Sequence, residues 1–237
     1  MSQLLIAADP DLTAQVNHLV TEDETPVDNL FSEKQQRLLT EPLYSSWTVP
    51  PDDDNPHEPR RFLAAANVGI FPTVHQPPLV PDMFLSLDVT VHPDWYDKSH
   101  RSYFFWEFGK APEVVIEIVS NRKGQETGSK LRDYARIRVP FYVVFDPTRQ
   151  LGDDLLQVFE LHGKKYHQRT DFKLPDVGLS LTLWEGIYEW HHATWLRWCD
   201  AQDSIILTGA ERATRETERA TRLAAKLREL GVDPDQV

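Results

Sequence analysis

The sequence predicts an α/β (α+β) fold in which helices flank a mixed central β-sheet, and three neighbouring patterns support this. The run EVVIEIVS (113–120) is almost continuously apolar, which is typical of a strand covered on both faces. QETGSKLRDYARIRV (125–139) has the apolar spacing of an amphipathic helix, and PFYVVF (140–145) is a second buried strand. Strand, helix and strand in this order form a βαβ crossover, so the two strands should be parallel or nearly so.

The composition suits one globular domain with appendages. The chain has 237 residues, of which 41% are hydrophobic, and this is enough for one sizeable core. Its single cysteine, Cys199, excludes an internal disulfide, and the start MSQLLIAADP lacks the basic and long apolar parts of a secretory signal. No run approaches the roughly 20 apolar residues of a membrane span. We therefore expect a cytoplasmic protein without a membrane segment.

An arm and a helix precede the first strand. Residues 1–31 are predicted to form an irregular acidic N-terminal arm. SEKQQRLLTEPLYSSW (32–47) is predicted to be a helix with Ser32 as its N-cap and Glu33 in its first turn. An acidic, proline-rich loop then separates this helix from the sheet.

Two acids are expected to meet at one end of the sheet. RRFLAAANVGIF (60–71) is strand-like, and MFLSLDVTV (83–91) alternates with a period of two, which places Asp82 on its more polar face. In EVVIEIVS the same alternation places Glu113 and Glu117 on one face. If the two polar faces lie side by side, Asp82 and Glu117 can converge.

Downstream of this unit we predict a hairpin, a further strand and two helices. The hairpin is LLQVFELHGKKYHQRT (155–170), and the strand is GLSLTLWEG (178–186). The aromatic segment IYEWHHATWLRWCD (187–200) is predicted to pack as a helix and to close a domain that spans residues 32–200. Residues 201–237 contain a charged, alanine-rich helix, which we expect to be solvated or, as the alternative, to mediate dimerisation.

The charge distribution permits nucleic-acid binding only locally. The formal net charge is −12, and duplex binding depends on lysine and arginine at phosphate. Between residues 110 and 150, however, eight basic residues stand against five acidic ones. Candidate nucleic-acid contacts are Arg122 and Lys123 in the loop SNRKGQETG, and Arg101 in an aromatic and basic segment. That segment is equally consistent with a packed loop or a dimer contact.

Glu117 is the strongest candidate for chemistry, because an ionised carboxylate among valines and isoleucines is expensive to bury without a function. Together with Asp82 it could bind a hard divalent cation, which would activate water for attack on phosphate. A lysine two residues after the acid would complete such a site, but Val119 stands there. Lys130 on the following helix could reach back to the same place, and Lys123 is its competitor.

These residues also carry a resemblance to a known family. The segments that carry it are VPDMFLSLDV, RSYFFWEFGKAPEVVIEIVS and KLRDYARIRVPFYVVFDP. They resemble the Uma2 family of "putative restriction endonucleases" in the PD-(D/E)XK nuclease superfamily, over roughly Ser32 to Glu185. The resemblance implies a restriction-endonuclease-like core, with Asp82 and Glu117 as its two acids and Lys130 as a lysine relocated from strand to helix. It also matches Glu33 to an acid on the first helix that can complete the metal site.

The resemblance therefore implies an endonuclease that uses Mg²⁺, with Mn²⁺ able to substitute, and DNA as its substrate. Asp82 and Glu117 would hold the metal, Lys130 would position water, and Glu33 or Glu113 could assist. A homodimer would suit an enzyme that cuts both strands of a duplex. Two alternatives stay open: a nuclease-fold binding or scaffolding protein that has lost turnover, and RNA or branched DNA as the substrate.

Overall fold

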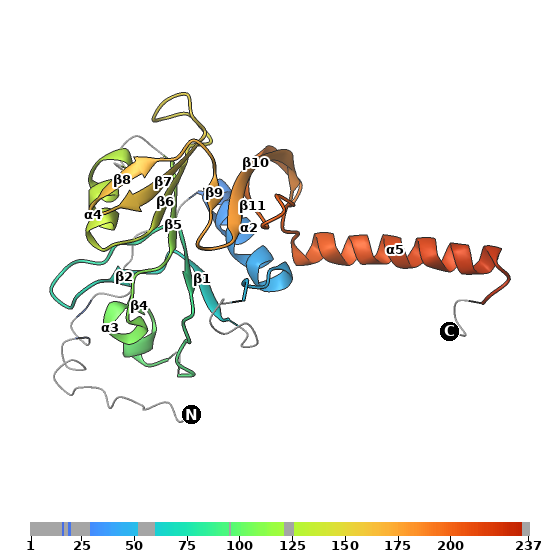
Figure 1. Ribbon diagram of the computed structural model, residues 1–237, viewed down its shortest axis with the longest axis horizontal. Helices are drawn as coiled ribbons and strands as arrows, with labels where there is room; N and C mark the ends of the chain where they lie inside the picture. Colours follow the sequence, from blue (N-terminus) through green and yellow to red (C-terminus); the bar gives the residue numbers. More distant parts are fainter. Residues whose placement is uncertain are drawn as a thin grey trace.

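A mixed six-stranded β-sheet runs through the centre of the molecule (Figure 1). The computed structural model describes Val16, Leu19 and residues 29–51, 60–94, 96–120 and 126–233. In spatial order the strands of the sheet are β1 (Phe62–Ala66), β3 (Met83–Leu87), β5 (Val114–Ile118), β6 (Phe141–Phe145), β7 (Leu156–His162) and β8 (Lys165–Gln168). β5 and β6 are parallel and the other neighbours are antiparallel, so the predicted mixed sheet and βαβ crossover are confirmed.

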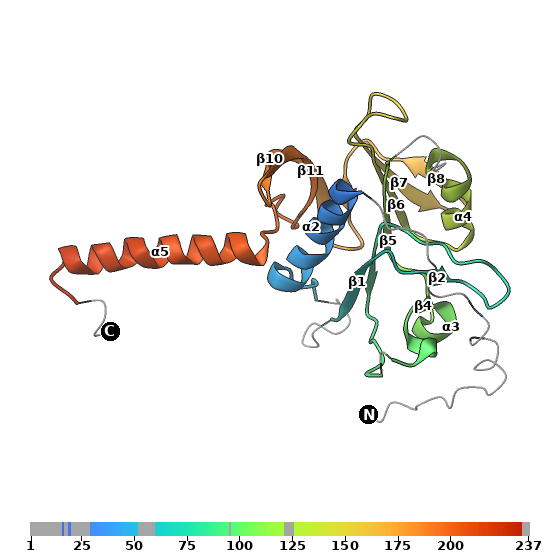
Figure 2. The ribbon, with the colours of Figure 1, turned by 180° about the vertical axis from the view of Figure 1, so that it is seen from behind.

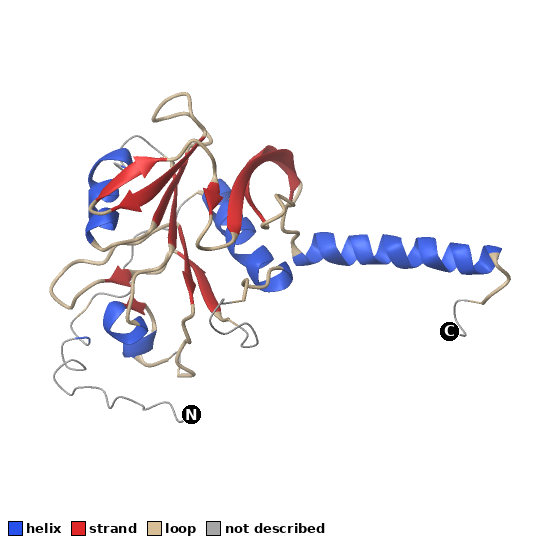
Figure 3. Cartoon of the chain, in the orientation of Figure 1, coloured by secondary structure: helices blue, strands red, loops and turns tan. Residues whose placement is uncertain are grey.

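Each face of the sheet is covered by its own layer (Figure 3). On one face lie α2 (Leu30–Ser46) and a small sheet of β9 (Lys173–Leu174), β10 (Leu179–Tyr188) and β11 (His191–Cys199). On the other lie α4 (Leu131–Arg136) and a segment with β2 (Ile70–Phe71), η1 (Lys98–His100), β4 (Tyr103–Phe104) and α3 (Phe105–Phe108). Because both faces are covered, every residue of β3, β5 and β6 is buried. The face of β3 that carries Asp82 is therefore also buried.

Helix α2 begins two residues earlier than the sequence predicts. Its N-cap is Asn29, whose side chain accepts hydrogen bonds from the backbone N–H groups of Phe31 and Ser32 at 3.0 and 3.1 Å. The prediction of Ser32 as N-cap is wrong, because asparagine is an equally good cap and Leu30 and Phe31 continue the helix toward it. Ser32 instead lies buried in the first turn.

The aromatic segment that ends the predicted domain forms a hairpin strand and not a helix. Residues 187–200 complete β10 and form β11, which pairs with it in antiparallel register. The segment contains three tryptophans, one isoleucine, one tyrosine and one threonine, which are residue types that favour strands. Its turn at Glu189 and Trp190 lacks the Asn-Gly pattern typical of two-residue hairpins, so the sequence gives no turn signal there.

The charged C-terminal helix is confirmed as α5 (Gly209–Glu229), which projects away from the sheets in both ribbon views (Figures 1 and 2). Thr208 and Glu211 form a capping box at its start, and none of its residues is buried. Gly231 follows the helix with a φ of 79°, a conformation that glycine adopts readily. Within the part of the chain that the structure describes, no helix is long and apolar enough to cross a membrane.

Candidate active site

Asp82 and Glu117 lie opposite each other at one end of the central sheet. β3 and β5 pair with Met83 opposite Ile116, and one further step of this register sets Asp82 opposite Glu117. Opposed residues of antiparallel strands have Cβ atoms about 5 Å apart. Both residues are buried, with relative exposures of 7% for Asp82 and 1% for Glu117. The expected convergence of the two carboxylates is therefore present.

Asp82 is held by the sheet and by α2. Its Oδ2 accepts a hydrogen bond from the backbone N–H of Ile118 at 2.6 Å, which fixes the side chain beside Glu117. Its Oδ1 accepts from Gln36 Nε2 at 3.0 Å. Gln36 also exchanges hydrogen bonds with Asn67, which follows β1. The carboxylate is thus oriented by groups from three elements.

Glu117 receives hydrogen bonds from two residues of the segment between β5 and β6. Lys130 Nζ donates to Oε2 at 2.7 Å, and the Tyr134 hydroxyl donates to Oε1 at 2.8 Å. The Lys130 side chain is 33% exposed, whereas that of Glu117 is 2% exposed. Lys130 therefore connects a buried carboxylate to the protein surface, and its bonds to a charged acceptor are of the stronger kind.

The local helix geometry explains how Lys130 and Tyr134 reach the same carboxylate. A π-helical turn, η2 (Glu126–Lys130), leads directly into α4. Residues four positions apart lie on one helical face, so both side chains point toward the sheet end. π-helical turns are rare and frequent at functional sites. Tyr134 is also buried among apolar side chains, as its place on the amphipathic face predicts.

Burial raises the pKa of Tyr134 well above its usual range, and the negative charges of Glu117 and Asp82 raise it further. The hydroxyl therefore stays protonated and serves as a donor. Both carboxylates, those of Glu117 and Asp82, raise the pKa of the same Tyr134 hydroxyl, which agrees with their positions next to each other.

Val119 explains why the lysine comes from the helix. The residue two positions after Glu117 points to the same side of the sheet, and Val119 is buried there at 1% exposure among Tyr134, Val139 and their neighbours. A lysine at this position would have to place its charge in an apolar cluster. On the helix, the Lys130 side chain stays 33% exposed while it contacts Glu117.

The other predicted site residues lie apart from this pair. Glu113 accepts from the backbone N–H of Leu87 at 2.8 Å and forms an ion pair with Lys110, at the opposite end of β5. Four residues of strand separate it from Glu117, about 13 Å. Arg101 donates to the backbone oxygen of Tyr96 at 2.7 Å on an exposed segment.

Glu33 is exposed and forms an ion pair with Arg37 on its own helix. Gln36, on the buried side of α2, is the residue of this helix that reaches Asp82. Arg122 and Lys123 lie outside the described residues.

Sequence reasoning did not assign Gln36 and Tyr134 to the site. A signal for each was present: Gln36 lies three residues before Leu39 on the apolar face of its helix, and Tyr134 follows Lys130 by one helical turn. A polar side chain on a core-facing stripe requires a hydrogen-bond partner, and here the partners are the two acids.

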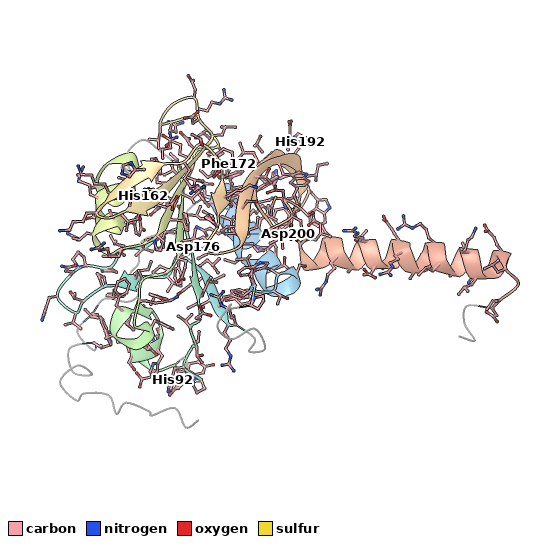
Figure 4. The ribbon with its side chains drawn as sticks, in the orientation of Figure 1. His92, His162, Phe172, Asp176, His192 and Asp200 are labelled. Atoms are coloured by element: carbon pink, nitrogen blue, oxygen red, sulfur yellow. The ribbon has the colours of Figure 1, made fainter. Side chains whose placement is uncertain are left out.

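Histidines of the described residues take part in no cluster of three or more metal-ligating side chains. His92, His162 and His192 lie at well-separated places (Figure 4). Among the described residues, no group of three or more histidine, cysteine, aspartate or glutamate side chains is arranged to hold a metal ion.

Comparison with known protein families gives a match to this chain. A family model, Uma2, described as "Putative restriction endonuclease", matches residues 23–187. The matched region contains every residue of the site described above. No curated protein matches the chain.

Proposed function

Because the chain belongs to the Uma2 family of "putative restriction endonucleases", we propose that it is a Mg²⁺-dependent endonuclease that hydrolyses phosphodiester bonds of DNA. The observation that carries the proposal is the joint placement of Asp82, Glu117 and Lys130 at one end of the sheet. Two carboxylates and a lysine within reach of solvent are the groups that such hydrolysis requires.

The donor set fits a magnesium ion. Mg²⁺ prefers oxygen ligands and is usually bound through one or two carboxylates, with water and phosphate oxygens completing its shell. Asp82 and Glu117 would be the protein ligands. When bound, the ion would lower the pKa of a water molecule and offset negative charge on the phosphate. Mn²⁺, which shares the preference for oxygen ligands, would substitute.

The other functions of the site would come from the side chains of Lys130, Gln36 and Tyr134. The Lys130 ammonium has three N–H donors. One donates to Glu117, and another would donate to the attacking water or to a phosphate oxygen. Its partial exposure lets it contact a substrate without rearrangement of the core. Gln36 and Tyr134 would hold Asp82 and Glu117 in place while charge develops at the phosphate.

A plasmid-nicking assay tests the proposal. Wild-type protein should nick supercoiled DNA with Mg²⁺ or Mn²⁺ and should stop when the metal is chelated. Lys130→Ala should lower the rate by about 10²- to 10³-fold, as expected when a preorganised hydrogen-bond donor to the developing charge is lost. Asp82→Asn and Glu117→Gln should abolish metal-dependent nicking while the fold is retained.

Glu113→Gln and Glu33→Gln are matched controls, because each removes one carboxylate of similar chemistry outside the cluster. Both should nick like wild type; a loss of rate would instead assign that acid an accessory role. Absence of nicking by wild type with either ion would favour the binding or scaffolding alternative. A homodimer is proposed on the same basis, since a duplex presents two strands to cut.

A further inference from the structure

Basic side chains gather on the outer side of α4 and at the turn between β7 and β8. We call this set the α4 basic face; it consists of Arg132, Arg136, Arg138, Lys164 and Lys165. All five residues are exposed, and the one acid among residues 131–138 and 162–165 is Asp133. A local excess of this size is unusual in a chain whose formal net charge is −12.

Arg138 connects the end of α4 to the turn between β7 and β8. Its backbone has a φ of 68°, and its Nη1 donates to the backbone oxygen of Gly163 at 2.7 Å. The turn of the β7–β8 hairpin is therefore fixed against the C-terminal end of α4. Both ribbon views show α4 beside β8, and His162 at the end of β7 lies in the same region (Figures 1, 2 and 4).

The acids near this face are already engaged. Asp133 pairs with Arg136 at 3.3 Å, with the Arg136 side chain 61% exposed, so this pair is weak. Glu160 is bound by Arg169 and lies 3.4 Å from His162. Arg132 and Lys164 have no acidic partner among the described residues.

The N-terminal end of α4 adjoins the candidate site, and the helix runs from there to the β7–β8 turn. Lys130 precedes α4 directly, and its Nζ contacts Glu117. The six steps from Lys130 to Arg136 span about 9 Å at the helical rise, which corresponds to two or three base pairs of a duplex at about 3.4 Å each. A phosphate backbone bound along α4 would thus lead into the pair of acids at the sheet end.

A second basic row lies on α5 and is the competing surface. A pocket of about 550 Å³ lies where α5 leaves the domain, and it is lined by Arg212, Arg215, Arg219 and Arg222. Asp200 and Glu216 line the same pocket, and both would repel a phosphate. α5 also extends away from the central sheet that carries the acids (Figure 1).

We propose that the α4 basic face binds the phosphate backbone of duplex DNA and directs the strand to Lys130 and Glu117. The inference rests on the proposed function, because it names the surface that this activity would use. Charge complementarity carries it: Arg132 and Lys164 have no acidic partner among the described residues, the Arg136–Asp133 pair is exposed and weak, and α4 directly follows Lys130, which contacts Glu117.

Fluorescence anisotropy with a labelled DNA duplex tests the inference in EDTA, where no cleavage interferes. The test protein carries Arg132→Gln, Arg136→Gln and Lys164→Gln. The control carries Arg215→Gln, Arg219→Gln and Arg222→Gln on α5, and so loses the same charge. All six residues are exposed, five of them lie on helices, where glutamine is nearly as favourable as arginine, and Lys164 lies in a turn, so both proteins should melt like wild type.

We expect the test protein to bind more weakly than wild type. Its plot of log affinity against log salt should be shallower by about 2.7, which is 0.9 for each of three phosphate contacts. The α5 control should match wild type. Equal weakening of both proteins would assign the effect to net charge and overturn the inference, as would unchanged binding by the test protein or no duplex binding by wild type.

Nicking, measured separately, distinguishes the two proposals. If wild type nicks DNA, and the test protein binds and nicks like wild type, the proposed role of the α4 basic face is overturned and the proposed function stands. If wild type binds DNA without nicking it, and only the test protein loses binding while the α5 control keeps it, the proposed function is overturned. The α4 basic face is then supported as a binding surface.

Discussion

Lys130 Nζ lies 2.7 Å from Glu117 Oε2, so a cation from a helix partners a carboxylate on the preceding strand, thirteen residues away. The two side chains differ in environment, since the lysine is one third exposed and the glutamate is almost fully buried. This geometry pairs the buried acid and leaves the ammonium partly accessible to a ligand. The relationship yields predictions for stability as well as for activity.

Lys130→Ala should destabilise the fold because it leaves the buried Glu117 carboxylate without this partner. Breaking a fully buried pair costs about 3–5 kcal/mol, and the partial exposure of Lys130 reduces the expected loss to about 1–3 kcal/mol. Urea unfolding at neutral pH measures it. Arg132→Ala on the exposed side of the next turn is the control and should stay within about 0.5 kcal/mol. Equal stabilities of the two variants would contradict the prediction.

Tyr134→Phe should weaken metal binding without disturbing the core packing of the ring. The variant removes the hydroxyl that donates to Glu117 Oε1, and loss of such a supporting contact costs about 10- to 100-fold in metal affinity or activity. The Mn²⁺ dependence of the nicking rate is the measurement. Tyr166→Phe is a matched control, because its hydroxyl donates to the backbone oxygen of Val139 and not to an acid. If both variants respond to Mn²⁺ alike, Tyr134 has no special role.

Gln36→Ala should lower nicking by about 10- to 100-fold, since Asp82 Oδ1 loses the donor that orients it. Glu33→Ala, one turn earlier on the same helix, removes an exposed side chain and should leave the rate unchanged. Initial rates at saturating Mg²⁺ compare the three proteins. The reverse order of effects would return the accessory role to Glu33.

The anchor of α5 should depend on acid pH through Glu211. Burial alone would raise the pKa of Glu211, but hydrogen bonds from Arg197 and Thr208 outweigh it and hold the pKa below its ordinary value of 4.5. An acid with a lowered pKa stabilises the fold above its ordinary pKa, and this contribution disappears as the pH falls through the lowered value. Glu211→Gln should therefore be less stable than wild type at pH 7 and should approach wild type well below pH 4.5. A difference in urea midpoint that is unchanged in acid would exclude this linkage.

Trp190→Gly should stabilise the β10–β11 hairpin. Glu189 and Trp190 have φ angles of 44° and 66°, and the left-handed region costs a residue with a Cβ roughly 1–2 kcal/mol. Trp190 is 97% exposed, so its loss removes little buried area. We expect a gain of about 1 kcal/mol in thermal or urea unfolding. Trp190→Ala keeps the strained Cβ and should show no gain; an equal gain there would point to the ring and not to the backbone.

Local pattern determined most of the fold. The apolar runs around Glu117 and Tyr142 predict buried strands because they have the length and continuity of strands covered on both faces. The amphipathic stretch between them predicts the crossover helix, and alternation predicts which face of its own strand carries Asp82 and which carries Glu117. These features depend on neighbours within a few residues, so the sequence carries them directly.

The tertiary structure decided which side chains serve the two acids and how the aromatic segment folds. Gln36 reaches Asp82 because the buried side of α2 packs against the end of β3. The N-cap of α2 is Asn29 and not Ser32. Residues 187–200 became a strand because β10 supplied the pairing partner, although no glycine marked the turn. Such outcomes depend on contacts between residues far apart in the chain, and periodicity within one segment cannot express them.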